Sequence, residues 1–98
     1  MKKYQLIDNT QDQCYEFRID GEVAKIDYMK TPNGEVALTH TEVPRNLQGQ
    51  GIGQALVESV LTHIEDEGLK VVPLCGFVIG YIRKNPQWKR VVLEGVNV

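Results

Sequence analysis

Three glycines stand close together in the segment Gln48-Gly49-Gln50-Gly51-Ile52-Gly53, immediately before an amphipathic run. Glycine has no side chain, so it lets a ligand approach the backbone closely and lets successive N–H groups point the same way. The amphipathic run predicts a helix, whose first turn adds unpaired amides and the positive end of the helix dipole. This combination is typical of a phosphate site, and three glycines in five residues favour it over a merely flexible loop.

The spacing excludes two common nucleotide-binding motifs. A P-loop requires a lysine after its second glycine, and no lysine lies between Lys30 and Lys70. A dinucleotide-binding fold requires Gly-x-Gly-x-x-Gly, but the last position is Gln54 when counted from Gly49 and Leu56 when counted from Gly51. The loop therefore predicts another kind of phosphate ligand.

Cys75 is a candidate nucleophile, because it follows a short apolar run at the predicted start of a short helix. A thiol reacts as its thiolate, and a helix start is one environment that lowers the pKa of a thiol. Free cysteine is more often a small buried apolar residue, so both interpretations of Cys75 stay open. We interpret Cys14, inside a predicted strand, as a packing residue.

His40 is a candidate base. The period of two in the strand predicts that His40 and Glu42 share one face with Val36 and Leu38. An imidazole can take a proton from an ammonium group, and Glu42 could orient it. A structural histidine that fixes the strand is the alternative, which we slightly favour.

The elements that must position these residues form a sheet and one long helix. Strands are predicted over residues 3–8, 14–19 and 35–43, and the alternation of Ala24, Ile26 and Tyr28 predicts another between the turns at Asp20-Gly21 and at Asn33-Gly34. Apolar residues at spacings of three and four predict a helix over 52–67, which Gly68 ends. Residues 69–74 then predict a buried strand parallel to the fourth strand, followed by a short helix. The order ββββαβα indicates an α+β fold with a mixed, mostly antiparallel sheet.

Length and composition exclude several classes of protein. The 98 residues predict one domain over 1–98. No stretch approaches the roughly 20 apolar residues of a membrane span, and Lys2 and Lys3 precede no apolar run typical of a signal peptide. With two cysteines and no export signal, we expect reduced thiols and a cytoplasmic protein. The net charge of −2 argues against generic binding to nucleic acid or to an anionic membrane.

The segment 48–53 resembles the (Arg/Gln)-x-x-Gly-x-(Gly/Ala) signature of the GNAT acetyltransferase superfamily. His40-Thr41-Glu42-Val43-Pro44 before the loop, Pro73-Leu74-Cys75 after the next strand and Asn85-Pro86-Gln87-Trp88 beyond it are similar to very small GNAT-like proteins. The resemblance runs from about His40 to Trp88, which is half of the chain.

This resemblance implies a minimal GNAT fold that binds acetyl-CoA as co-substrate, uses no metal and acetylates an amine. The acceptor would be a small amine, a protein lysine or a protein N-terminus. The residues that the resemblance assigns to the coenzyme are Val43, Gln48, Gly49, Gln50, Gly51, Ile52, Gly53, Gln54 and Asn85. The resemblance also implies a catalytic role for Cys75, at the gap between the fourth and fifth strands. For Tyr81 it implies a role as general acid. Core packing is the alternative for Tyr81, and we favour it.

The chain departs from larger GNAT enzymes, which carry further C-terminal strands, and the departure is clear on the acceptor side. Those enzymes have two helices that wall the acceptor side, whereas residues 14 to 43 show no helical pattern, so we expect an open acceptor side. The missing wall motivates an alternative, a CoA-binding or interaction module with little transferase activity. An exposed strand edge would allow a monomer or a weak homodimer.

Overall fold

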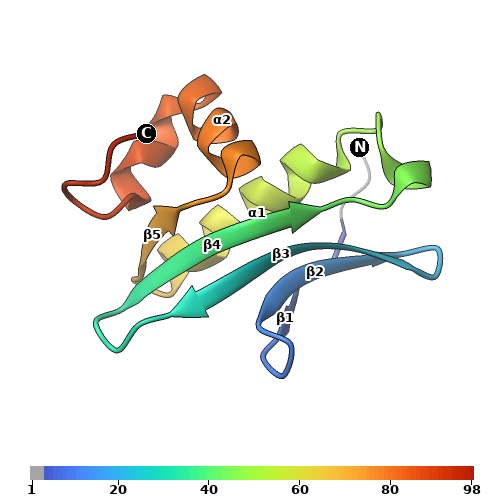
Figure 1. Ribbon diagram of the computed structural model, residues 1–98, viewed down its shortest axis with the longest axis horizontal. Helices are drawn as coiled ribbons and strands as arrows, with labels where there is room; N and C mark the ends of the chain where they lie inside the picture. The colour runs from blue at the N-terminus through green and yellow to red at the C-terminus, as the bar shows by residue number, and fades with distance from the viewer. Residues whose placement is uncertain (1–3) are drawn as a thin grey trace.

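The computed structural model describes residues 4–98, and its strands form one mixed sheet in the order β1-β2-β3-β4-β5 (Figure 1). The antiparallel strands are β1 (Ile7–Asn9), β2 (Cys14–Ile19), β3 (Glu22–Lys30) and β4 (Glu35–Glu42), and β5 (Lys70–Pro73) is parallel to β4. The helices are α1 (Ile52–Asp66) and α2 (Gly76–Lys84), with short 3₁₀ helices η1 (Arg45–Leu47) and η2 (Pro86–Val91). The predicted α+β class and its mixed, mostly antiparallel sheet are confirmed.

Three details differ from the prediction. The first strand, expected over 3–8, covers only Ile7–Asn9, and residue 3 lies outside the described residues. The two 3₁₀ helices were not expected. In the second of them Pro86 occupies the first turn, where its missing N–H costs no hydrogen bond. The chain then runs along the outer edge of β5, where Val92 bridges Val71 and the Leu93 amide donates to the Val71 carbonyl at 2.9 Å.

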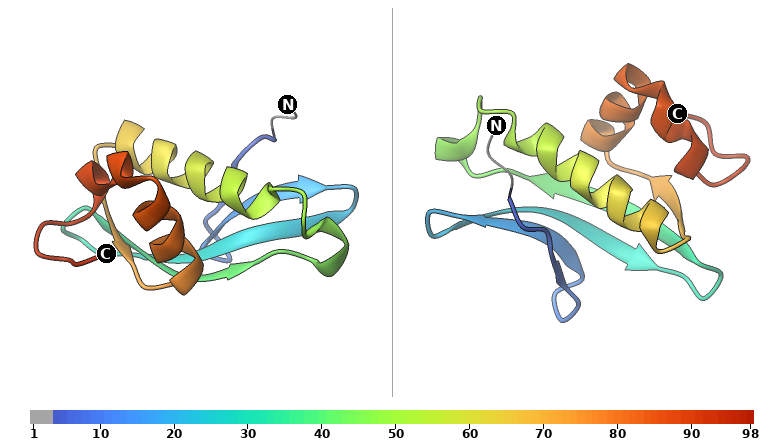
Figure 2. Two further views of the ribbon diagram at one scale, coloured as in Figure 1. Left: turned by 90° about the horizontal axis from the view of Figure 1, so that it is seen from above. Right: turned by 180° about the vertical axis from the view of Figure 1, so that it is seen from behind.

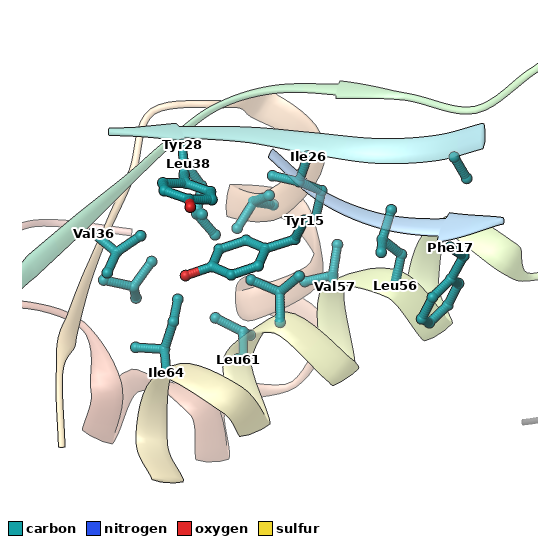
Figure 3. Packing of buried hydrophobic residues seen from close by; sticks show 14 of the residues in the cluster. Tyr15, Phe17, Ile26, Tyr28, Val36, Leu38, Leu56, Val57, Leu61 and Ile64 are labelled. Atoms are coloured by element: carbon teal, nitrogen blue, oxygen red, sulfur yellow. The ribbon is translucent and has the colours of Figure 1, made fainter. Parts of the chain in front are cut away.

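The hydrophobic core lies between the sheet and α1 (Figures 2 and 3). The apolar stripe of α1 is fully buried and contacts the side chains of β2, β3 and β4 that alternate toward it. The buried residues of α1 are Ile52, Gly53, Leu56, Val57, Val60, Leu61 and Ile64. In residues 4–98 no helix covers the opposite face of the sheet, and no helix is long and apolar enough to cross a bilayer.

A β-bulge in β4 changes which residues face the helices. Tyr28 pairs with Leu38 and Asp27 pairs with His40, so Thr39 is an extra residue without a partner. Because a shift of one residue exchanges the two faces of a strand, Thr41 opposite the buried Ile26 lies on the helix side. The prediction that His40 and Glu42 share the face of Val36 and Leu38 is therefore wrong.

Two neighbouring tyrosines in the core make a testable pair. Tyr15 is fully buried beside the rings of Tyr28 and His63, and its hydroxyl has no hydrogen-bond partner among the described residues. The Tyr28 hydroxyl donates to Asp8 Oδ1 at 2.6 Å. Since an unpaired buried hydroxyl costs free energy, Tyr15→Phe should raise the free energy of unfolding by about 1 kcal/mol, and Tyr28→Phe should lower it by about the same amount.

Urea unfolding of both variants beside the unchanged protein measures these differences. A Tyr15→Phe protein that is less stable than the unchanged one would contradict the assignment, because it would mean that the hydroxyl is paired in solution.

Candidate functional site

The glycine loop between β4 and α1 has a backbone that requires glycine at two positions. Gly49 and Gly51 have φ values of 79° and 75°, in the left-handed region that residues with a Cβ rarely adopt. Gly51 is also the N-cap of α1, and no side chain caps this helix end. The loop is held instead by two glutamines, since Gln48 Nε2 donates to the Val43 carbonyl at 3.0 Å and Gln50 Nε2 donates to the Asn46 carbonyl at 3.3 Å.

The backbone amides of residues 49–54 have no hydrogen-bond acceptor among the residues that the structure describes. The first hydrogen bond of α1 runs from the Ala55 amide to the Gly51 carbonyl at 3.0 Å. Among the hydrogen bonds within residues 4–98, none is donated by an N–H group of residues 49–54. These donors stand at the positive end of a 15-residue helix, so the loop can offer several hydrogen bonds to anionic oxygens.

Gly53 has a different role, because it makes room for an aromatic ring. A Cβ at Gly53 would lie 2.8 Å from Phe77 Cζ and 3.6 Å from Val43 Cγ2. The absence of a side chain therefore lets Phe77, at the start of α2, pack directly on the first turn of α1. This contact joins the loop to α2.

A cavity of about 340 Å³ opens beside the loop. It is lined by the end of β4, the loop, the first turn of α1 and Phe77. The lining residues are Thr41, Val43, Leu47, Gln48, Gly49, Gly51, Ile52, Gly53, Gln54 and Phe77. Of the residues expected to contact the coenzyme, only Gln50 and Asn85 are not part of this lining.

Strands β4 and β5 part next to this cavity. Their pairing ends with Leu38 opposite Pro73, and the Leu74 amide makes a last hydrogen bond to the Leu38 carbonyl at 2.9 Å. Beyond that point β4 continues to Glu42, whereas the chain after β5 turns into α2. The structure thus has the expected gap between the fourth and fifth strands.

Cys75 lies at this gap as the N-cap residue of α2. Its Sγ is 3.2 Å from Oγ1 of Thr41, and the residue is partly buried. Burial of the sulfur raises its pKa, but the Thr41 hydroxyl and the nearby backbone amides of Val78, Phe77 and Thr41 favour the thiolate. The net result is a pKa of Cys75 below its usual value. The sulfur makes no side-chain cap hydrogen bond to α2.

The second thiol has the opposite environment. Cys14 is buried, and its Sγ donates to Glu16 Oε2 at 3.5 Å. Burial and then the hydrogen bond to Glu16 raise the pKa of Cys14 to about 11. The structure therefore separates a thiol disposed to ionise, Cys75, from one held neutral.

Comparison with known proteins identifies the family of this chain. Residues 14–91 match the family model of the GCN5-related N-acetyl-transferase. This chain belongs to that family. The chain is similar to an NMR solution structure from Staphylococcus aureus, with a TM-score of 0.70 and 26% sequence identity. That protein is GCN5-like and has been assigned as an N-acetyltransferase. The similarity covers 95% of this chain and 91% of that one. No curated protein is similar enough to count as a match.

In this GCN5-related protein His40 lies on the uncovered face of the sheet. Its side chain is 60% exposed, and its Nε2 is 3.7 Å from Glu42 Oε1, so the expected neighbourhood of these two residues is confirmed. His40 is absent from the lining of the cavity beside the loop and does not lie on the same side of the sheet as Thr41. A catalytic role for His40 stays a prediction.

Tyr81 and Asn85 lie at a second cavity, of about 270 Å³, beyond Phe77. The Tyr81 hydroxyl donates to Glu58 Oε2 of α1 at 3.3 Å, and its ring packs against the core. Asn85 ends α2, where its Nδ2 donates to the Tyr81 carbonyl at 2.9 Å. The structure therefore places Tyr81 and Asn85 close to each other. Neither residue takes part in the contact between Cys75 and Thr41.

Sequence reasoning missed Thr41, as well as Leu47 and Phe77 in the lining of the cavity. A regular alternation places Thr41 opposite to Val36 and Leu38, on the face away from the core. Only the extra residue at Thr39 turns its side chain toward Cys75. We find no signal in the sequence that marks the bulge.

Proposed function

We propose that this protein transfers the acetyl group of acetyl-CoA to an amine. The observation that carries the proposal is the set of unpaired amides at residues 49–54, which lies on a cavity that extends along β4 to Thr41. When bound, the coenzyme supplies an acetyl group activated as a thioester. Everything else in the reaction is left to the residues of the chain.

The residues present fit a coenzyme that has an anionic end and an apolar arm. The amides of the glycine loop suit pyrophosphate oxygens, and Gly49 and Gly51 leave the approach to them free of side chains. Beyond the loop, the cavity is lined by the side chains of Val43, Leu47 and Phe77, which suit a chain with methylene groups. The Lys84 ammonium at the second cavity offers a cation to a further phosphate group.

At the reaction centre, the chain offers a thiol and a hydroxyl at the gap between β4 and β5. Cys75 has two candidate roles: its thiolate accepts the acetyl group from the thioester, or its thiol gives a proton to the departing sulfur. In the first role, the new bond joins Sγ to the acetyl carbon, the bond from that carbon to the coenzyme sulfur breaks, and that sulfur takes up a proton. The lowered pKa of Cys75 supports the first role, because more of the thiol is ionised near neutral pH.

The acceptor amine would approach from the face of the sheet that has no helix. His40 and Glu42 are exposed on that face, close along β4 to Thr41, and are suited to take a proton from an incoming ammonium group. Without walls, this face accommodates a small amine, a lysine side chain or a protein N-terminus. Tyr4 and Val98, close to the two ends of the chain, both pack against the one core, so we propose that 1–98 acts as one domain.

Release of the coenzyme thiol from acetyl-CoA tests the proposal, followed with a thiol reagent in the presence of polyamines, amino acids and lysine peptides. We expect at least one amine to accelerate thiol release in proportion to the amount of protein. Binding of acetyl-CoA without acceleration by any amine would favour the alternative, a coenzyme-binding module. The absence of acceptor-side helices from the described residues is the observation that supports this alternative.

A further inference from the structure

We propose that Thr41 is the positioning residue for Cys75, with its hydroxyl holding the sulfur at the gap between β4 and β5. This inference rests on the proposed function for its catalytic meaning, but the contact itself can be tested without any transfer of acetyl groups.

The first argument is the geometry of the contact. Thr41 Oγ1 lies 3.2 Å from Cys75 Sγ, although the two residues are 34 positions apart in the chain and belong to different elements. The contact lies just beyond the last hydrogen bond between the two strands, where the Leu74 amide meets the Leu38 carbonyl. The Thr41 hydroxyl therefore links β4 to the start of α2 at a point where the backbones of β4 and β5 no longer form hydrogen bonds.

The second argument is the bulge at Thr39. If Thr39 occupied a regular, paired position in β4, the alternation would turn Thr41 away from the helices and its hydroxyl would not reach Cys75. The bulge interrupts the regular pairing of β3 with β4. Its effect at this position is to bring Thr41 to the sulfur of Cys75. Val43, two residues further along the chain and just beyond β4, also lines the cavity.

The third argument concerns the groups around the sulfur. Burial is the largest influence on the pKa of Cys75, and it raises the pKa. The influences that lower it are the Thr41 hydroxyl and the backbone amides of Val78, Phe77 and Thr41. Titratable side chains occur on the neighbouring elements: His40 and Glu42 on β4 form a pair on the far face, Lys25 and Asp27 on β3 form another, and Tyr81 on α2 is bonded to Glu58 of α1. None of these side chains is in hydrogen-bond contact with Cys75, so a neutral hydroxyl is the side chain that orients the thiol.

The chemistry of the pair follows from these contacts. Toward a thiol, the hydroxyl oxygen can accept a hydrogen bond from the S–H group; toward a thiolate, the same hydroxyl rotates and donates a hydrogen bond to the sulfur. A hydrogen bond to a charged group is worth enough to change an ionisation constant by about tenfold. Thr41 can therefore fix the direction of the sulfur and favour its reactive form with one group.

The test measures alkylation of Cys75 by iodoacetamide as a function of pH, with peptide mass spectrometry to separate Cys75 from the buried Cys14. The variants are Thr41→Val, which keeps the shape and lacks the hydroxyl, and Thr41→Ser, which keeps the hydroxyl. We expect Thr41→Val to slow alkylation at neutral pH by about tenfold and to move the midpoint of the profile to higher pH, while Thr41→Ser stays within about threefold. Thr41→Ala replaces Thr41→Val if the latter does not fold.

A profile for Thr41→Val that coincides with that of the unchanged protein overturns the inference, whatever happens to activity. Where acetyl transfer is measurable, Thr41→Val should lower kcat and leave the KM for acetyl-CoA unchanged, and an unchanged kcat would also overturn it. If alkylation shifts as expected but the unchanged protein transfers no acetyl group, the proposed function fails, whereas the positioning of Cys75 by Thr41 stands.

Discussion

Gly51→Glu should weaken the binding of acetyl-CoA by about a hundredfold or more, because it places a carboxylate among the amides that are expected to hold the pyrophosphate. Like charges brought together at an interface cost several kcal/mol, and a hundredfold loss corresponds to about 2.7 kcal/mol. The new side chain has room, since nothing lies within 4 Å of a Cβ at Gly51. Titration calorimetry of the two proteins measures the difference.

Backbone strain at Gly51 needs a matched control. The φ of 75° is unfavourable for any residue with a Cβ, but asparagine adopts this conformation more readily than most. Gly51→Asn should therefore retain binding within about tenfold of the unchanged protein, because it adds bulk without charge. Equal binding by the unchanged protein and Gly51→Glu would exclude the glycine loop as the pyrophosphate site.

Cys75→Ala should lower the rate of acetyl transfer by about a hundredfold or more, since a positioned acid, base or nucleophile contributes this much or more to a rate. If the Cys75 thiolate is the nucleophile, transfer by the unchanged protein should also rise with pH through a midpoint below the ordinary pKa of a thiol, because the pKa of Cys75 is lowered and the thiolate forms above it; a general acid would give a fall instead. Thiol release measured against pH, with the amine found above, provides both results.

Cys14→Ala is the matched control for the loss of a thiol, because Cys14 is buried away from the loop and its pKa is raised. It should transfer acetyl groups at the rate of the unchanged protein. Intact mass after incubation with acetyl-CoA separates the two roles of Cys75, since only the nucleophile gains one acetyl group, which Cys75→Ala lacks. A fully active Cys75→Ala protein would make Cys75 a packing residue.

The fold was accessible from the sequence because its signals are local. Alternation in β3 and the spacing of Leu56, Val60 and Ile64 in α1 report directly which residues the core buries. The glycine loop is likewise local: the need for left-handed residues at Gly49 and Gly51 appears as glycine itself. For these features, each residue carries its own evidence.

The parts that were wrong or missed depend on contacts between distant residues. The bulge at Thr39 is set by the pairing of β4 with β3, and it moved His40 to the far face and Thr41 to Cys75. Gly53 lines the expected cavity, but it also has a packing reason that was missed, because a Cβ there would meet Phe77, 24 residues later. Neither relation can be read from the neighbours of a residue in the chain.

The path of the chain after η2 has a consequence for the behaviour of the protein in concentrated solution. Val92 and Leu93 run beside β5 and occupy part of its outer edge, and the strand at the other end of the sheet, β1, has only three residues. Open strand edges are where proteins join into fibres, and very short or covered edges prevent this. A chain cut before Val92 would lose that protection and leave the outer edge of β5 open to pairing with other chains.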